Sequence, residues 1–292
     1  MLSARWTVSV VALACLVAAC GGQADTAPAV VATPEVTLDR AEAAVSSPLD
    51  VTYRFRVLPG NTLSKDYTVF VHFVDADGEL MWTDDHVPAV PTTQWTSDAP
   101  VTYSRTMFVP KFPYEGQTFV DVGLWDPSTG ERVKMEGEGA NRAYRVASFG
   151  MKLQSDAPFL VFTEGWHQVE GTGESATAIE WHWTKGEGTL ACKNPKTDLV
   201  LYLELDQPVA EAGATRAEVR IGDTVLDTVD LTSHARSLRK IPISAAQLGD
   251  ADATTIRIVP DATFIPANVP SLQNSDTREL GVRVFRANLQ PK

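Results

Sequence analysis

The chain has 292 residues, which allows one large domain or two domains of ordinary size. Its hydrophobic content of 44% and mean hydropathy of −0.09 exclude a protein that crosses a membrane many times. The formal net charge of −12 repels phosphate backbones, and no stripe of lysine and arginine offsets it locally. Nucleic acid is therefore not an expected partner.

Residues 1–19 have the pattern of an export signal. One positive charge, Arg5, precedes an apolar run over 8–19 that only Ser9 interrupts, and small residues lead into Cys20. The run is shorter than the roughly 20 residues that span a bilayer, which favours a cleaved signal peptide. A plain secretory signal that happens to contain a cysteine is the alternative interpretation.

Residues 20–35 predict a flexible tether. The segment 21–33 is rich in glycine, alanine, threonine and proline and has few bulky side chains. Such a composition buries too little apolar surface to order itself, so we expect it to hold a folded body away from its anchor.

The residues that end at Cys20 resemble the lipobox of bacterial lipoproteins. The resemblance implies cleavage after residue 19, a lipid anchor of the palmitate type on Cys20, and a location in the cell envelope. The membrane is then a partner through that lipid. Gly21 is not the aspartate that retains many lipoproteins at an inner membrane, so the resemblance implies the outer membrane in a cell with two membranes.

Residues 36–152 predict a first β-sandwich. Val51, Tyr53, Phe55 and Val57 alternate with polar residues, as in a strand with one wet face, and Asp77-Gly78 marks a hairpin turn. The stretch 67–74 is apolar almost throughout, which predicts a central strand. Further strands are expected at 103–109, 118–125 and 144–147.

Residues 158–289 predict a second β-sandwich after a junction near residue 155. Alternating leucines over 199–205 place one face of a strand in a core, and Gly222-Asp223 joins strands at 216–221 and 224–231. Apolar residues at 256–258 and 280–284 predict the closing strands. The single helical turn expected is at 244–248, where Ser244 and Gln247 form a possible capping box. The predicted fold class is all-β, with two antiparallel sandwiches of immunoglobulin-like or jelly-roll-like type.

A set of motifs in residues 45–148 resembles a β-sandwich module appended to bacterial membrane glycosyltransferases and found in other envelope proteins. The motifs are 69–74 (VFVHFV), 84–88 (DDHVP), 91–95 (PTTQW), 108–110 (FVP) and 123–127 (GLWDP). The resemblance implies a sandwich fold and no general catalytic role.

The second half is similar to another accessory β domain of that setting. The matching pieces are 164–166 (EGW), 180–183 (EWHW), 199–205, 263–266 (TFIP) and 276–281 (DTRELG). This resemblance implies a carbohydrate-binding jelly roll. The sequence lacks the membrane-embedded catalytic segment of the transferases, so transferase chemistry is not expected.

The best candidate ligand-binding residues are Trp166, His167, Trp181 and Trp183, because flat aromatic rings stack on the apolar faces of sugars. In a strand, Trp181 and Trp183 share one face and the residue between them points away. The alternative interpretation, in which both tryptophans are core residues, is favoured over a sugar-binding surface. The same alternatives apply to the weaker candidates, which are Trp82, Trp95 and Trp125.

Other chemistry has weaker support. His72, Asp84, Asp85 and His86 lie close enough in sequence to suggest a metal site, but adjacent strand residues point in opposite directions, so turn chemistry is favoured and no metal or cofactor is expected. A glycosidase needs two facing carboxylates, for which the candidates close in sequence are Glu164, Glu170 and Glu180. Asp276 and Arg278 predict a local ion pair, and Cys192 is either a reactive thiol or a small buried hydrophobe.

Three functions are consistent with these features. The first is a non-catalytic envelope lipoprotein that binds carbohydrate or an envelope polysaccharide. The second is a structural or assembly lipoprotein whose sheet edges and aromatic patches bind a protein partner. The third is an exported hydrolase with an unrecognised site. A sandwich hosts many functions, so the site has to decide among them.

Overall fold

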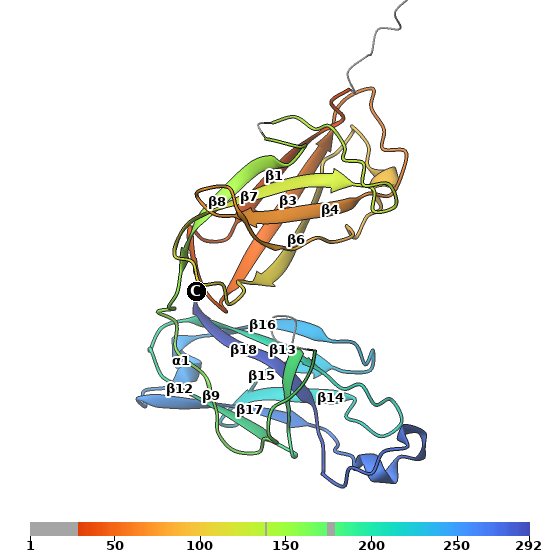
Figure 1. Ribbon diagram of the computed structural model, residues 1–292. Coiled ribbons are helices and arrows are strands. Elements are labelled where there is room, and N and C mark those ends of the chain that lie inside the picture. The colour runs from red at the N-terminus through yellow and green to blue at the C-terminus, as the bar shows by residue number, and fades with distance from the viewer. Residues whose placement is uncertain (1–28, 138, 174–178) are drawn as a thin grey trace, which may run out of the picture.

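The computed structural model describes residues 29–137, 139–173 and 179–292, and these residues form an all-β fold, as the sequence predicts (Figure 1). The sheets are antiparallel except where β2 runs parallel to β8. The predicted signal at 1–19 and the predicted lipid site at Cys20 lie outside the described residues.

The N-terminal part of the fold consists of two sheets that pack face to face. One has the strand order β1-β3-β6 and the other has the order β2-β8-β7-β4-β5. The strands are β1 (Ala32–Leu38), β2 (Glu42–Ala44), β3 (Pro48–Val57), β4 (Thr68–Val74), β5 (Leu80–Thr83), β6 (Val101–Phe108), β7 (Gly116–Trp125) and β8 (Tyr144–Lys152).

Alternation and apolar runs locate the core of this first domain. On β3, Val51, Tyr53, Phe55 and Val57 are buried while the residues between them are partly or fully exposed. The apolar stretch on β4 lies between β5 and β7 and is almost entirely buried. Burial of these side chains is the main stabilising term for the domain.

The C-terminal part is a second pair of sheets. Their orders are β10-β11-β18-β13-β16 and β15-β14-β17-β12-β9. The strands are β9 (Val161–Phe162), β10 (Glu170–Thr172), β11 (Ile179–Trp183), β12 (Gly188–Lys193), β13 (Leu199–Asp206), β14 (Arg216–Ile221), β15 (Thr224–Asp230), β16 (Ser237–Ile243), β17 (Ala253–Pro260) and β18 (Arg283–Pro291).

Aliphatic side chains fill the core of this second domain. The leucines of β13 point inward and are fully buried, and Ile256 and Ile258 face them from the other sheet. Cys192 is buried in the same cluster, where burial raises the pKa of its thiol. The thiol is therefore a packing element, which is the second of its two predicted roles.

Short helical turns occur in both domains. The predicted turn is present as α1 (Ala245–Leu248), and Ser244 and Gln247 form the expected capping box. The remaining turns of this kind among the described residues are the 3-10 turns η1 (Thr92–Gln94), η3 (Pro266–Asn268) and η4 (Pro270–Leu272).

The predicted tether is too long at its C-terminal end. Strand β1 begins at Ala32, which is fully buried opposite Val57 of β3. The small residues of 32–35 have a tether-like composition, yet they fit beside bulky core neighbours. Pro34 is tolerated because β1 is an edge strand, where a missing N–H breaks no inner ladder.

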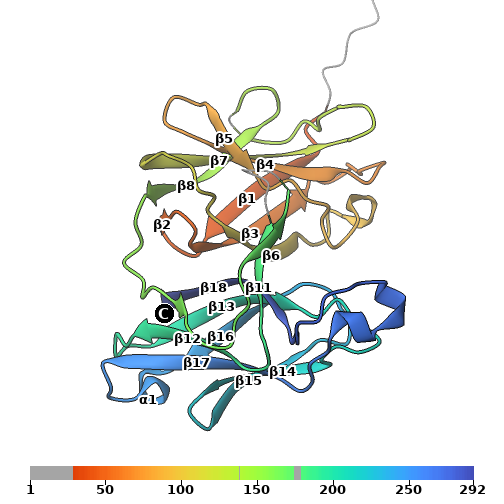
Figure 2. The same ribbon diagram turned by 60° about the horizontal axis from the view of Figure 1, so that its bottom comes forward.

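The two domains meet through one sheet of each. Figure 2 shows β13 and β18 on the side of the second domain that faces the first, with β3 and β6 above them. The leucines of β13 point away from this junction, so its polar residues point into it.

Candidate functional site

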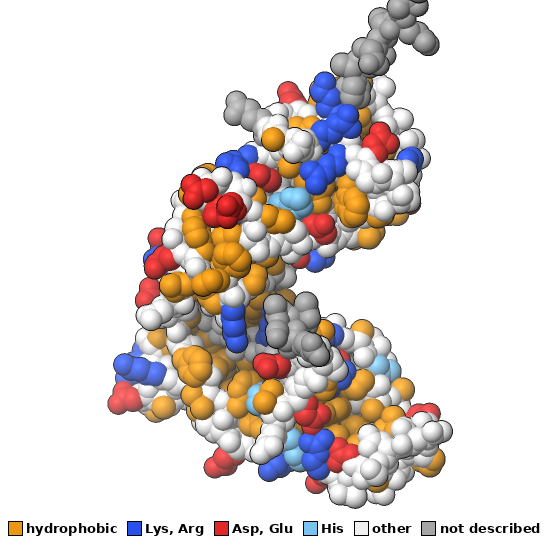
Figure 3. Space-filling model, viewed as in Figure 1, with side chains coloured by type: hydrophobic (Ala, Val, Ile, Leu, Met, Phe, Trp, Pro, Cys, Tyr) orange, Lys and Arg blue, Asp and Glu red, His pale blue; other side chains and the backbone are white. Residues whose placement is uncertain are grey.

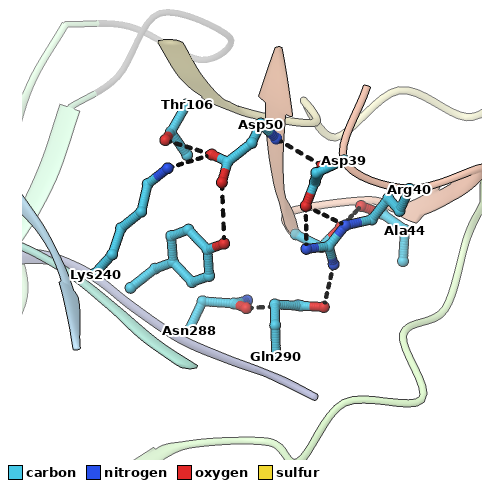
Figure 4. A network of polar contacts seen from close by, with 10 residues as sticks. Asp39, Arg40, Ala44, Asp50, Thr106, Lys240, Asn288 and Gln290 are labelled. Carbon is cyan, nitrogen blue, oxygen red and sulfur yellow. Dashed lines mark hydrogen bonds and ion pairs between the residues drawn. The ribbon is translucent and has the colours of Figure 1, made fainter. Parts of the chain in front are cut away.

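Asp50 on β3 is the centre of the junction between the domains (Figure 4). Its carboxylate accepts hydrogen bonds from Lys240 of β16 at 2.6 Å and from Tyr202 of β13 at 3.4 Å. Thr106 on β6 donates a further bond at 2.6 Å. One carboxylate thus connects two strands of each domain.

A second group of bonds lies beside it. Arg40 donates from Nη1 to the side-chain oxygen of Gln290 on β18 at 2.8 Å, while its other nitrogens contact Asp39. Asn288 reaches the backbone carbonyl of Ser46 at 3.4 Å. Gln290 and Tyr202 are buried, so the domains are in close contact here rather than joined only by the chain.

Beside this contact the surface is hollowed between the domains (Figure 3). The hollow has a volume of about 360 Å³, which is within the range of small-ligand sites. Both domains line it, with the residues Trp82, Thr83, Asp84, Thr106, Met107, Phe108, Pro110, Glu204, Leu238 and Arg286. We call this hollow the junction cleft.

The first domain supplies aromatic side chains to the junction cleft. Trp82 on β5 stacks on the buried Phe73 with ring centroids 4.7 Å apart and planes inclined by 11°. Its indole N–H is buried and has no hydrogen-bond partner among the described residues. A buried donor without a partner is costly.

The second domain supplies charged side chains. Glu204 on β13 lies between Arg286 of β18, at 3.5 Å, and Arg236, at 3.7 Å. The guanidinium of Arg286 lies 4.5 Å from the ring centre of Phe108 in the first domain. This cation–π contact spans the cleft and orients the arginine.

Glu204 and Trp181 lie on the same outer face of the second domain and are connected by contacts of Arg236 and Phe285. Arg236 lies over the ring of Phe285 at 3.8 Å, and Phe285 packs 6.0 Å from Trp181. Arg283 lies 5.1 Å from the centre of the Trp181 ring and is held by two 2.7 Å bonds to the buried Asp206. Trp181 is half-buried, and its indole N–H also has no partner among the described residues.

The structure does not bring the four main candidates into one aromatic platform. Trp183 shares a face with Trp181, but it is buried against Phe264. Trp166 packs on the other side of the sheet with Phe162 and donates to the Thr189 carbonyl. His167 contacts the carbonyl of Glu279 through Nε2. Strand alternation therefore separates Trp166 from Trp181.

The three weaker candidates also lie in different surroundings. Trp95 is buried against Phe55 and donates to the Val90 carbonyl, so it belongs to the core. Trp125 ends β7 and does not line the junction cleft. Of the three, only Trp82 lines the cleft.

The residues considered for a metal are engaged elsewhere. Asp85 accepts from the backbone N–H of Val71, Asp84 pairs with Arg105 at 3.3 Å, and His86 contacts the Tyr103 hydroxyl at 2.9 Å. Burial lowers the pKa of His86 and raises that of Tyr103. Among the described residues, no three His, Cys, Asp or Glu side chains converge as metal ligands would.

The other acidic residues named from the sequence either form ion pairs within the second domain or are exposed to solvent. Asp276 and Arg278 form the predicted ion pair at 2.6 Å, and Arg278 also binds Glu170 at 2.6 Å. Arg278 holds the pKa of the Asp276 carboxyl below its usual range through side-chain and backbone hydrogen bonds. Glu164 and Glu180 are exposed.

Sequence reasoning did not single out Glu204, Arg236, Phe108 or Arg286. A signal for one of them was present, because Glu204 is a charged residue inside the apolar run 199–205. The arginines carry no such signal, since each lies on an exposed face with ordinary composition.

No protein-family model and no curated protein matches this chain. Solved structures match it weakly. Trypsin-activated alpha-2-macroglobulin from Escherichia coli is 14% identical, with 90% of this chain and 16% of that one covered at a TM-score of 0.28. A calcium-binding mutant of Bacteroides uniformis beta-glucuronidase 2 is 10% identical, with coverages of 89% and 30% and a TM-score of 0.28.

The secreted serine protease VesC from Vibrio cholerae is 10% identical, with coverages of 88% and 51% and a TM-score of 0.24. This chain thus spans about half or less of the length of each of the three proteins. Within the part of the chain that the structure describes, no helix is long and apolar enough to cross a membrane. TM-scores this low support no argument about function, so the functional argument rests on the junction cleft.

Proposed function

We propose that this protein is a lipid-anchored envelope protein that binds carbohydrate in the junction cleft without catalysing a reaction. The observation that carries the proposal is the lining of the cleft. It combines the ring of Trp82 with the charged side chains of Glu204 and Arg286.

This combination suits a sugar. The side chains of Trp82 and Phe108 offer apolar surface to the C–H face of a pyranose, while charged side chains bind its hydroxyl groups. The cleft is open and lies between two domains, which suits part of a longer polysaccharide better than a small molecule that must be enclosed.

A binding role fits the carboxylates of the cleft better than hydrolysis. Asp84 lines the cleft from the first domain and Glu204 from the second, but each contacts a guanidinium group. Glycosidases need one carboxylic acid that donates a proton and a second carboxylate that acts on the sugar. Paired carboxylates of this kind bind and orient hydroxyl groups.

The anchor is proposed from the sequence, because Cys20 lies outside the described residues. Two or more acyl chains give stable membrane attachment, at about 0.8 kcal/mol per buried CH₂. Replacing Cys20→Ser should move the protein from the membrane fraction to the soluble fraction. Unchanged membrane partition would contradict the lipid anchor and leave the carbohydrate proposal in place.

The binding proposal is tested on a glycan array with residues 21–292 and two matched variants. Trp82→Phe keeps a ring against Phe73 but removes the N–H and part of the surface, so glycan binding should weaken several-fold. Trp125→Phe removes the same kind of buried, unpartnered N–H outside the cleft and should change nothing. Both variants should keep a melting temperature near that of the wild type. Equal effects of the two, or no glycan bound by the wild type, would overturn the proposal.

One observation favours the second candidate function, in which a protein partner binds. The edge strand β1 and the first residues of β8, which precede its pairing with β2, lie beside a surface hollow of about 480 Å³, lined by residues such as Glu35, Val36 and Arg145. An open sheet edge is a template for strand addition. Protection of β1 and β8 amides from hydrogen exchange, on addition of an envelope extract, would support this role.

A further inference from the structure

The two arginines that meet at Glu204 are paired more loosely than Arg239 and Arg283. Arg239 and Asp227 form two hydrogen bonds of 2.8 and 3.1 Å, and Arg283 binds Asp206 through two bonds of 2.7 Å. These are the short bidentate contacts that arginine and carboxylate prefer. Arg286, which lines the cleft, and Arg236, which does not, approach Glu204 only to 3.5 and 3.7 Å.

The reason is that both arginines share one acid. Glu204 faces Arg286 with one oxygen and Arg236 with the other. Two guanidinium groups therefore surround a single carboxylate, and the group carries one excess positive charge. This excess is local, since the whole chain has a net charge of −12.

Aromatic rings hold both guanidinium groups in place. Arg286 lies over Phe108 at 4.5 Å and Arg236 lies over Phe285 at 3.8 Å. Their side chains nevertheless remain 51% and 37% exposed. Among the described residues neither side chain donates a hydrogen bond of ordinary length, so part of each guanidinium group is open to solvent. Preorganised donors lose little entropy when a ligand binds.

We infer that the carbohydrate bound in the junction cleft is an acidic saccharide, whose carboxylate is bound by Arg286. This inference rests on the proposed function and names its ligand class. A planar guanidinium matches a carboxylate with two parallel hydrogen bonds. The ligand carboxylate completes the pairing that Glu204 leaves unfinished, while Trp82 contacts the sugar ring.

The experiment measures binding of the protein to acidic oligosaccharides and to the same oligosaccharides after reduction of their carboxyl groups. The probes are oligogalacturonides, alginate oligosaccharides and hyaluronan oligosaccharides, each with its reduced form. At least one acidic probe should bind, and its reduced form should bind about tenfold more weakly or not at all. Binding should also weaken as the salt concentration rises, because the contact is between charges near the surface.

Variants locate the effect. Arg286→Gln should weaken binding of the acidic probe about tenfold or more and remove the preference over its reduced form. Arg286→Lys keeps the charge but loses the paired donors, so it should lie between the wild type and Arg286→Gln. Arg239→Gln removes an arginine of β16 that does not line the cleft and should leave binding unchanged.

The two proposals fail in different ways. Equal binding of the acidic and reduced forms, lost in Trp82→Phe, would overturn the acidic ligand and leave the carbohydrate site standing. An acidic preference that survives in Arg286→Gln would also overturn this inference. Binding of none of the probes, in either form, would overturn both proposals.

Discussion

The two domains use aromatic residues in opposite ways. In the first domain the rings of Tyr53, Phe55, Phe73, Phe149 and Trp95 lie inside the core. In the second domain the buried residues of the main core are aliphatic, apart from Cys192. Its aromatic residues lie in a small satellite cluster, at the margin of the main core, or on the outer face, where Trp181 packs near Phe285.

This difference shows why an aromatic residue in a strand is a poor guide to binding by itself. A sandwich packed with leucine, valine and isoleucine is filled without aromatic rings, so its tryptophans lie around the main core rather than in it. A sandwich that uses rings for its core leaves few for a site. In the first domain Trp82 has both roles, because its ring stacks on Phe73 of the core and the residue also lines the cleft.

The largest expected effect compares one substitution in the two settings. Phe73→Ala removes a fully buried ring that also contacts Phe149, so it should destabilise the protein by about 3–5 kcal/mol. Phe285→Ala removes a half-buried ring on the outer face and should cost about 1 kcal/mol. Chemical denaturation measures both values, and equal losses would contradict the contrast between the domains.

A smaller effect is expected at the junction itself. Asp50→Asn removes the charge that Lys240 binds and should cost about 1–2 kcal/mol. The domains should also become more mobile relative to each other, which small-angle scattering would detect as a larger radius of gyration. Asp75→Asn, in the turn after β4, keeps its turn hydrogen bonds and serves as the control. An unchanged radius in Asp50→Asn would show that the remaining contacts suffice.

The smallest effect concerns pH and the first domain. Burial lowers the pKa of His86 below its ordinary value near 6.5, so the folded protein keeps this imidazole neutral. As the pH falls through 6.5, the unfolded chain binds a proton at this position that the folded chain does not. Stability therefore declines with acidification in that range.

Replacing His86→Gln should make the melting temperature less dependent on pH between 7.5 and 5.5. Burial lowers the pKa of His72 in the same direction, so part of the dependence should remain in the variant. A dependence identical to that of the wild type would contradict the role of His86.

Several local features follow from the sequence because neighbouring residues decide them. The alternation of Val51, Tyr53 and Phe55 gives a half-buried strand, and Asp77-Gly78 gives the turn between β4 and β5. The capping box at Ser244 forms as predicted. Composition was a less reliable guide than alternation. The residues from Ala32 onward have the composition of a tether, but they pair with β3, a strand that is not adjacent in the sequence.

The candidate site depends on contacts that no local pattern contains. Trp82 is a sequence-level candidate, but its partners across the cleft, Glu204 and Arg286, lie in the other domain. The bond between Asp50 and Lys240 joins residues 190 positions apart. The alternation of apolar and polar side chains determined the strands and their buried faces, because it depends only on residues two positions apart. The choice between a buried and a ligand-facing tryptophan was made only when two sheets packed together and left the cleft between them.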